Sequence, residues 1–216
     1  MKNLRIYLAA MMVLACAACG SEPTKPSVAP PAQAAQNSGT NLLMQACKLP
    51  GFECLYQPIT VNIAHRDGSP YSMVLQSPNV VIQHNSVTVF AGQTVNIEGD
   101  IQGDKLVNLH MVDSVTHPEK TIVMQLEQVA MDNIPGGHMM IFTINNPFDL
   151  NMKYHAEMMP LDMPPGRKQG FFKTSTCPVM AKISGSESWP EPIFQLMLSD
   201  FHFPDPASAE GSTCSE

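Results

Sequence analysis

The chain has 216 residues and carries 12 basic and 19 acidic side chains, a formal net charge of −7 at pH 7. This acidic balance argues against nucleic acid as a partner and against electrostatic docking onto anionic lipid headgroups. Hydrophobic residues make up 44% of the chain and charged residues only 14%, so the length is sufficient for one domain with a substantial core. Methionine is unusually frequent: 13 of the 16 methionines follow Cys19.

The N-terminus has the organisation of a secretory signal peptide. Lys2 and Arg5 precede an apolar stretch over residues 6–15, and small residues follow it. The apolar stretch, even when extended to Ala18, is shorter than the roughly 20 residues that a transmembrane helix requires. We therefore expect residues 1–18 to be removed after export.

The residues at the expected cleavage point, Ala17-Ala18-Cys19, resemble the lipobox of bacterial lipoproteins. The resemblance implies that a cysteine is lipidated there and becomes the N-terminus of the mature protein, which is then attached to a membrane by its lipid. Cys16 is an alternative, because Val13 stands three positions before it, as the family pattern requires. We favour Cys19, because cleavage there leaves four cysteines, an even number that can pair in an oxidising compartment.

The same resemblance bears on localisation. Neither Gly20 nor Ser21 is the aspartate that retains enteric lipoproteins in the inner membrane. The resemblance therefore implies anchoring in the outer membrane, with the protein facing the periplasm.

Composition divides the mature chain into a tether, a domain and a tail. Residues 19–41 are rich in Pro, Ala and Ser and have no periodic apolar face, which predicts a disordered tether. Residues 42–203 form the predicted domain, and residues 204–216 form a short C-terminal tail.

Within residues 42–203, apolar residues recur at every second position, which is the period of a β-strand. Turn residues recur every eight to twelve positions, and no helical spacing persists beyond two turns. We therefore predict an all-β fold: an antiparallel β-sandwich or partly open barrel with eight or more strands. The alternating runs are Ile59, Val61 and Ile63; Val87 and Val89; Val95 and Ile97; Val107, Leu109 and Met111; Ile122, Met124 and Leu126; and Phe148, Leu150, Met152, Tyr154, Ala156 and Met158.

The four cysteines of the mature chain are expected to form two disulfides. Cys47 and Cys54 bracket a Pro50-Gly51 turn, so we expect them to pair, which leaves Cys177 with Cys214. Four cysteines allow three connectivities, and this choice rests on proximity in the sequence alone. The spacing does not match that of a zinc site.

Methionine and histidine together suggest one sharper hypothesis, a Cu(I) site, because thioether and imidazole are ligands that a soft cation accepts. The segment from His110-Met111 through Met124 to Gly137-His138-Met139-Met140 resembles, in residue types, the motif of periplasmic Cu(I) chaperones of cupredoxin-like fold. The spacings on both sides of Met124 depart from that family. The resemblance implies His138 and Met140 as candidate copper ligands.

Strand geometry favours a packing role for most of these methionines. Met111 and Met124 share their strand faces with apolar neighbours, so we expect them in the core, where methionine fills gaps. A second candidate ligand set is His155, Met159 and Met163. Met159 and Met163 lie in a Pro- and Gly-rich segment, residues 158–166, which we expect to form a stiff loop. This loop is either a contact surface or soft-metal site, or it folds over the end of the sandwich.

Catalytic motifs are not found. Gly185-Ser186-Glu187 lacks the second glycine of a nucleophile elbow, and His65-Arg66-Asp67 is interpreted as part of a turn. We therefore expect a lipid-anchored periplasmic or outer-membrane protein that binds an envelope protein or ligand without catalysis and without a cofactor. The alternative is a Cu(I)-binding or copper-tolerance lipoprotein.

Overall fold

The computed structural model describes residues 42–131, 137–163, 166–205, 207–209 and 211–214. The predicted signal peptide, the tether and both candidate lipidation sites, Cys16 and Cys19, lie outside the described residues, as do Pro164 and Pro165. Within the described part of the chain, no helix is long and apolar enough to cross a membrane.

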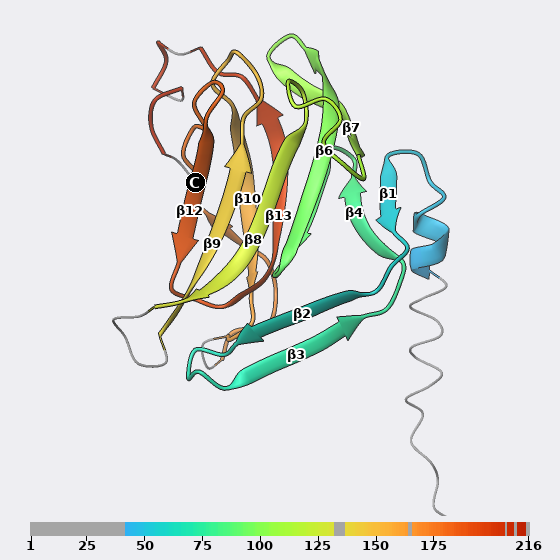
Figure 1. Cartoon of the computed structure of the whole chain (residues 1–216), viewed down its shortest axis with the longest axis vertical. Helices are drawn as coiled ribbons and strands as arrows, with labels where there is room; N and C mark the ends of the chain where they lie inside the picture. The colour runs from blue at the N-terminus through green and yellow to red at the C-terminus, as the bar shows by residue number, and fades with distance from the viewer. Residues whose placement is uncertain (1–41, 132–136, 164–165, 206, 210, 215–216) are drawn as a thin grey trace, which may run out of the picture. The chain divides into compact units, whose positions relative to one another are not determined.

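The fold is all-β and antiparallel, as predicted (Figure 1). One helical turn, residues 42–46, precedes the first strand. The described strands are β1 (Phe52–Leu55), β2 (Ile59–Ala64), β3 (Pro70–Leu75), β4 (Asn79–Gln83), β5 (Ser86–Phe90), β6 (Gln93–Gln102), β7 (Lys105–Met111), β8 (Ile122–Ala130), β9 (His138–Asn145), β10 (Lys153–Pro160), β11 (Phe172–Thr174), β12 (Ser184–Trp189) and β13 (Ile193–His202).

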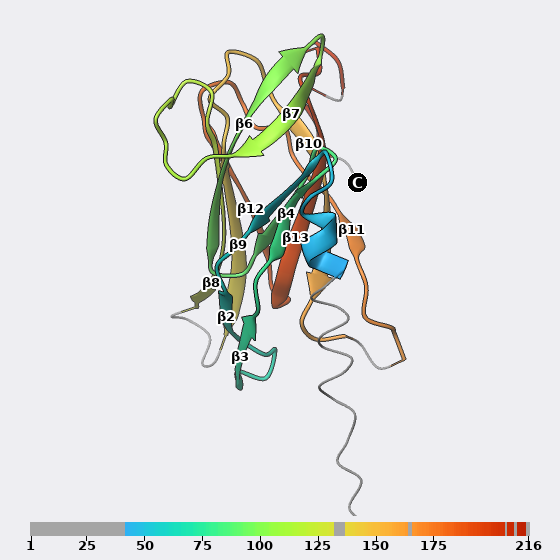
Figure 2. The ribbon, with the colours of Figure 1, turned by 90° about the vertical axis from the view of Figure 1, so that its right-hand side faces the viewer.

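Eleven strands form one large curled sheet. Nine of them follow one another in the order β1-β4-β5-β13-β7-β6-β8-β9-β12, and β10 pairs with both β13 and β11. Strands β8, β9 and β12 make one layer, and β4, β13 and β11 lie on the other side of the core (Figure 2). Strands β6 and β7 connect the layers, because β6 pairs with β8 while β7 pairs with β13. The result is a sandwich built from a single sheet.

The β2–β3 hairpin pairs with no other described strand. It crosses one end of the sandwich (Figure 1), and Ile59, Val61 and Ile63 of β2 are no more than 6% exposed within the main core. Alternation on β2 places these residues inward and Thr60 and Asn62 outward. The hairpin therefore closes one end of the core with side chains alone, without backbone pairing to the large sheet.

The buried residues confirm several of the predicted alternating runs and differ from the prediction in two of them. Ile122, Met124 and Leu126 are completely buried. In β7, however, Leu106 and Leu109 are the buried residues and Val107 is only half-buried. The cause is Asn108, whose φ of 54° breaks the alternation between these two leucines.

The second correction concerns the longest predicted run. Strand β10 begins only at Lys153, and Leu150 is 46% exposed. Asn146 organises the preceding segment instead, because its Oδ1 accepts the Phe148 N–H while its Nδ2 donates to the Leu150 and Val179 carbonyls. These side-chain bonds replace a strand ladder over residues 148–151.

Both expected disulfides are present. Cys47 pairs with Cys54, and Cys177 pairs with Cys214 across a sequence separation of 37. Gly51 in the first loop has a φ of 80°, which permits the tight turn that brings Cys47 to Cys54. The second disulfide holds the C-terminal segment against the residues that follow β11.

A buried carboxylate stabilises the junction of β6 and the segment before β8. Glu98 is 3% exposed, lies 2.6 Å from the Lys120 ammonium and accepts a hydrogen bond from the Thr121 hydroxyl at 3.0 Å. Its third neighbour is His117, whose Nδ1 lies 3.2 Å from the carboxylate. These hydrogen bonds lower the pKa of Glu98 to about 2, and the bond from Lys120 has the largest effect. Burial acts in the opposite direction but is outweighed.

We expect Glu98→Gln to remove a pH-dependent part of the stability. A carboxyl whose folded-state pKa is lowered stabilises the fold above its unfolded pKa, and this contribution disappears as the pH falls through the folded-state value. The Tm of the variant should therefore lie several degrees below that of the wild type above about pH 4.5, and the gap should close toward pH 2. Exposed Asp113→Asn is the control; parallel pH profiles for the wild type and Glu98→Gln would contradict the assignment.

Candidate functional site

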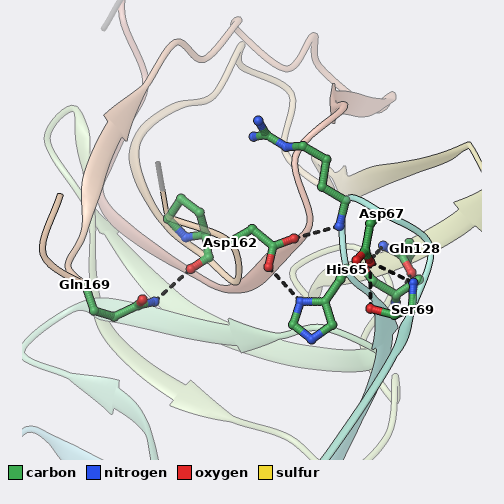
Figure 3. A network of polar contacts seen from close by, with 9 residues as sticks. His65, Asp67, Ser69, Gln128, Asp162 and Gln169 are labelled. Carbon is green, nitrogen blue, oxygen red and sulfur yellow. Dashed lines mark hydrogen bonds and ion pairs between the residues drawn. The ribbon is translucent and has the colours of Figure 1, made fainter. Parts of the chain in front are cut away.

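One carboxylate, that of Asp162, fixes the turn between β2 and β3 to the segment that follows β10 (Figure 3). Its Oδ1 lies 2.6 Å from His65 Nδ1, and its Oδ2 accepts a hydrogen bond from the Arg66 backbone N–H at 2.6 Å. His65 and Asp162 are 97 positions apart in the sequence. The contact therefore joins the hairpin to the large sheet and brings Arg66 beside the end of β10.

The ionisation of Asp162 follows from this arrangement. Burial acts to raise the pKa of Asp162, but the hydrogen bonds from His65 and from the Arg66 backbone outweigh it and hold the pKa below its usual value. The carboxylate is therefore ionised at neutral pH, with both oxygens already bonded inside the protein. Its role is to position the hairpin.

Two further side chains complete this network in Figure 3. Gln128 of β8 accepts the Ala64 N–H at 2.6 Å and donates to the Ala64 carbonyl at 3.0 Å. Inside the turn, the Asp67 carboxylate accepts hydrogen bonds from the backbone N–H and the hydroxyl of Ser69. The turn between β2 and β3, of which the sequence predicts His65-Arg66-Asp67 to be a part, is thus held both internally and against the large sheet.

A pocket of about 370 Å³ opens beside this network. Its apolar lining consists of Met158 and Pro160 of β10, Met163 from the segment after β10, and Phe172 of β11. The methionines and Phe172 are half-buried. The volume falls in the range of small-ligand pockets. The charged side chains at the pocket are Arg66, Asp162, Arg167, Lys173 and Glu191.

The charges around the pocket are not balanced. Glu191 is paired with Arg66 at 3.6 Å, and Asp162 is bonded as described above. Arg167 lies over the ring of Phe172, with its Cζ 5.8 Å from the ring centroid. Within the described residues, no carboxylate lies within 4.0 Å of Arg167 or Lys173. Lys173 is registered opposite Glu157 of β10, so Arg167 is the cation at the pocket that has no acidic partner among the described residues, in a chain whose net charge is −7.

The structure does not bring His155, Met159 and Met163 together. His155 and Met159 are four positions apart on β10, a separation of about 13 Å along a strand. Met163 lines the pocket, but Met158 accompanies it there rather than Met159. The expected loop is also shorter than predicted, because Met158, Met159 and Pro160 belong to β10.

The other candidate pair, His138 and Met140, lies on one face of β9. Met140 is completely buried in the core, and His138 is half-buried at the start of the strand. Within the described residues, no group of three or more His, Cys, Asp and Glu side chains is arranged to hold a metal ion. Methionine is not among these side-chain types, so copper binding by His138 and Met140 or by the other set stays a prediction.

His155 belongs to a different cluster, on the outer side of β10, β13 and β7. Asp200 lies 3.0 Å from the Lys105 ammonium and 3.8 Å from the Nδ1 atoms of both His155 and His202. The salt bridge to Lys105 is the largest cause of a lowered Asp200 pKa. This cluster ties the ends of the three strands together through a single carboxylate.

A buried lysine lies under the C-terminal segment. Lys153 of β10 is 1% exposed, and its ammonium donates a hydrogen bond to the Thr213 carbonyl at 2.9 Å. Thr213 directly precedes Cys214, which is bonded to Cys177. The alternation of β10 places Lys153 on the same outer face as exposed His155, and the C-terminal segment contacts its ammonium there.

The sequence pattern identified only part of the pocket. Met158 and Met163 belong to the segment that was singled out, but Arg66, Arg167 and Phe172 carried no recognisable signal. Comparisons with protein-family models, curated proteins and solved structures find no match to this chain.

Proposed function

We propose that this chain is a secreted, lipid-anchored envelope protein that binds another envelope component without catalysing a reaction. The observation that carries the proposal is the pocket of about 370 Å³ beside the β2–β3 turn, lined by half-buried apolar side chains and bordered by Arg167 and Lys173. Half-exposed apolar side chains that surround a concave site are typical of a binding surface. The polar contacts of Asp162 and Gln128 support this role, because they hold one wall of the pocket in place.

The N-terminal sequence supports the anchor and the location. The lipobox resemblance at Cys19 supports attachment to a membrane through a lipid, and Gly20 and Ser21 favour the outer membrane. A lipid-analogue label supplied to an expressing bacterial host should be incorporated by the wild type and by Cys16→Ser, and lost in Cys19→Ser. If the label is lost in Cys16→Ser and kept in Cys19→Ser, the lipidated residue is Cys16 instead.

The binding role is tested with the mature protein immobilised and exposed to an envelope extract. We expect the wild type to retain a reproducible component, and Met163→Glu to retain at least about ten-fold less, because a carboxylate is placed among the apolar side chains of the pocket. Met180→Glu is the matched control, since Met180 is 52% exposed and does not line the pocket. No reproducible component, or equal retention by Met163→Glu, would refute the proposal.

A further inference from the structure

We propose that the pocket binds an acidic peptide segment in which an Asp or Glu side chain lies close to a large apolar side chain. This inference rests on the proposed binding function and specifies the chemical class of the partner. It depends on three features of the pocket: its charge, its apolar lining and its place at a sheet edge.

The charge of the pocket favours a ligand with an anionic group. The carboxylates of Asp162 and Glu191 are already engaged by groups of the protein itself. Arg167 has no carboxylate within 4.0 Å among the described residues, so its charge is available to a ligand, whereas Lys173 is registered opposite Glu157 of β10. Arginine recognises a carboxylate with two parallel N–H groups, and the contact of Arg167 with the Phe172 ring favours one orientation of its guanidinium.

The apolar lining favours a ligand in which a large apolar side chain lies next to that anionic group. Met158, Met163 and Phe172 are half-buried, so a ligand that covers them removes apolar surface from water. Methionine adapts its shape to different apolar partners, which suits a site that accepts Leu, Ile, Phe or Met.

The position of β11 indicates an extended peptide. Strand β11 pairs with β10, and its other edge has no strand partner among the described residues. Phe172 and Lys173 of β11 both line the pocket, so the pocket lies beside this strand. A peptide strand along the free edge of β11 can form backbone hydrogen bonds while its side chains reach the apolar lining and Arg167.

An alkyl chain with an anionic head shares part of this chemistry but fits less well. The methionines and the phenylalanine of the lining are half-exposed, so an alkyl chain on them stays partly in water. It also offers no backbone groups to the edge of β11. We therefore commit to the peptide and make the anionic alkyl chain an outcome of the test.

The test exposes the mature protein to a displayed library of random nonapeptides, with dodecanoate as a separate probe. We expect enriched peptides to carry Asp or Glu within two positions of Phe, Leu, Ile or Met. Their affinity should fall about ten-fold or more in Arg167→Glu and in Phe172→Ala. The matched controls are Lys168→Glu and Phe171→Ala, exposed neighbours of the same type that do not line the pocket.

Each other outcome overturns the inference. Enrichment of basic or uncharged peptides, or an affinity that is unchanged in Arg167→Glu, excludes acidic peptides as the ligand class. Dodecanoate binding that is lost in Arg167→Glu, without peptide enrichment, assigns the site to an anionic alkyl chain. If no peptide is enriched but the envelope component is still lost with Met163→Glu, the proposed function stands and only the ligand class fails.

Discussion

Removing the Cys177–Cys214 disulfide is expected to lower the free energy of unfolding by about 4 kcal/mol. The crosslink spans a sequence separation of 37, and the entropy that it removes from the unfolded chain increases with the length of the closed loop. The matched control is the Cys47–Cys54 disulfide, whose separation of 7 predicts a loss of about 2.5 kcal/mol. Denaturant unfolding of the two double Cys→Ala variants measures both losses.

The same variant should expose Lys153. With the crosslink absent, the Thr213 carbonyl is no longer fixed above the Lys153 ammonium, which is otherwise 1% exposed. Mass spectrometry after treatment with an amine-reactive reagent should detect modified Lys153 only in the Cys177→Ala/Cys214→Ala protein, whereas exposed Lys168 should react in both proteins. If Lys153 stays protected in the folded variant, contacts other than the disulfide hold the C-terminal segment in place.

Replacing Asp162 with Ala is expected to loosen the β2–β3 hairpin without unfolding the large sheet. The hairpin has no backbone pairing to that sheet, so its attachment depends on its buried apolar face and on the contacts of Asp162 and Gln128. Loss of two hydrogen bonds to a carboxylate should cost about 1–2 kcal/mol of local stability. Hydrogen exchange over residues 59–75 should therefore become about ten-fold faster or more.

Acid should reproduce this effect in the wild type. The pKa of Asp162 is lowered in the folded protein, so its contribution is present above the unfolded pKa of about 3.9 and is lost as the pH falls below that value. Asp149→Ala is the matched control, because the Asp149 side chain is 89% exposed and pairs with Lys182. Equal exchange in the wild type and Asp162→Ala would mean that the apolar face alone holds the hairpin.

Residues whose burial depends only on strand alternation were predictable from the sequence. Ile59, Val61 and Ile63 lie inward on β2, and Ile122, Met124 and Leu126 lie inward on β8. Every second side chain of a strand points to the same face, so apolar residues at alternate positions identify the buried face. Val107 departs from its pattern because the left-handed backbone at Asn108 interrupts the alternation, and nothing in the surrounding sequence marks that conformation.

Features that depend on distant segments were not predictable. Lys153 has the alternation of an exposed residue, yet it is 1% exposed and its ammonium donates a hydrogen bond to the carbonyl of Thr213, 60 positions later. The pocket likewise depends on segments that are far apart in the sequence. Arg66 follows strand β2 of the hairpin, and Phe172 lies on the three-residue strand β11. Local patterns cannot indicate that such segments meet.

The Cys47–Cys54 disulfide has a mechanical consequence if the domain is held by its N-terminal end, as we propose. A pull on that end passes through the helical turn at residues 42–46 and reaches Cys47, from which the crosslink offers a shorter covalent route to Cys54 than the intervening backbone. The backbone between the two cysteines therefore carries little of the load, which reaches β1 at Cys54. Because Cys54 is registered with Val80 of β4, the pairing of β1 with β4 is the first strand pairing that such a pull meets after the helical turn.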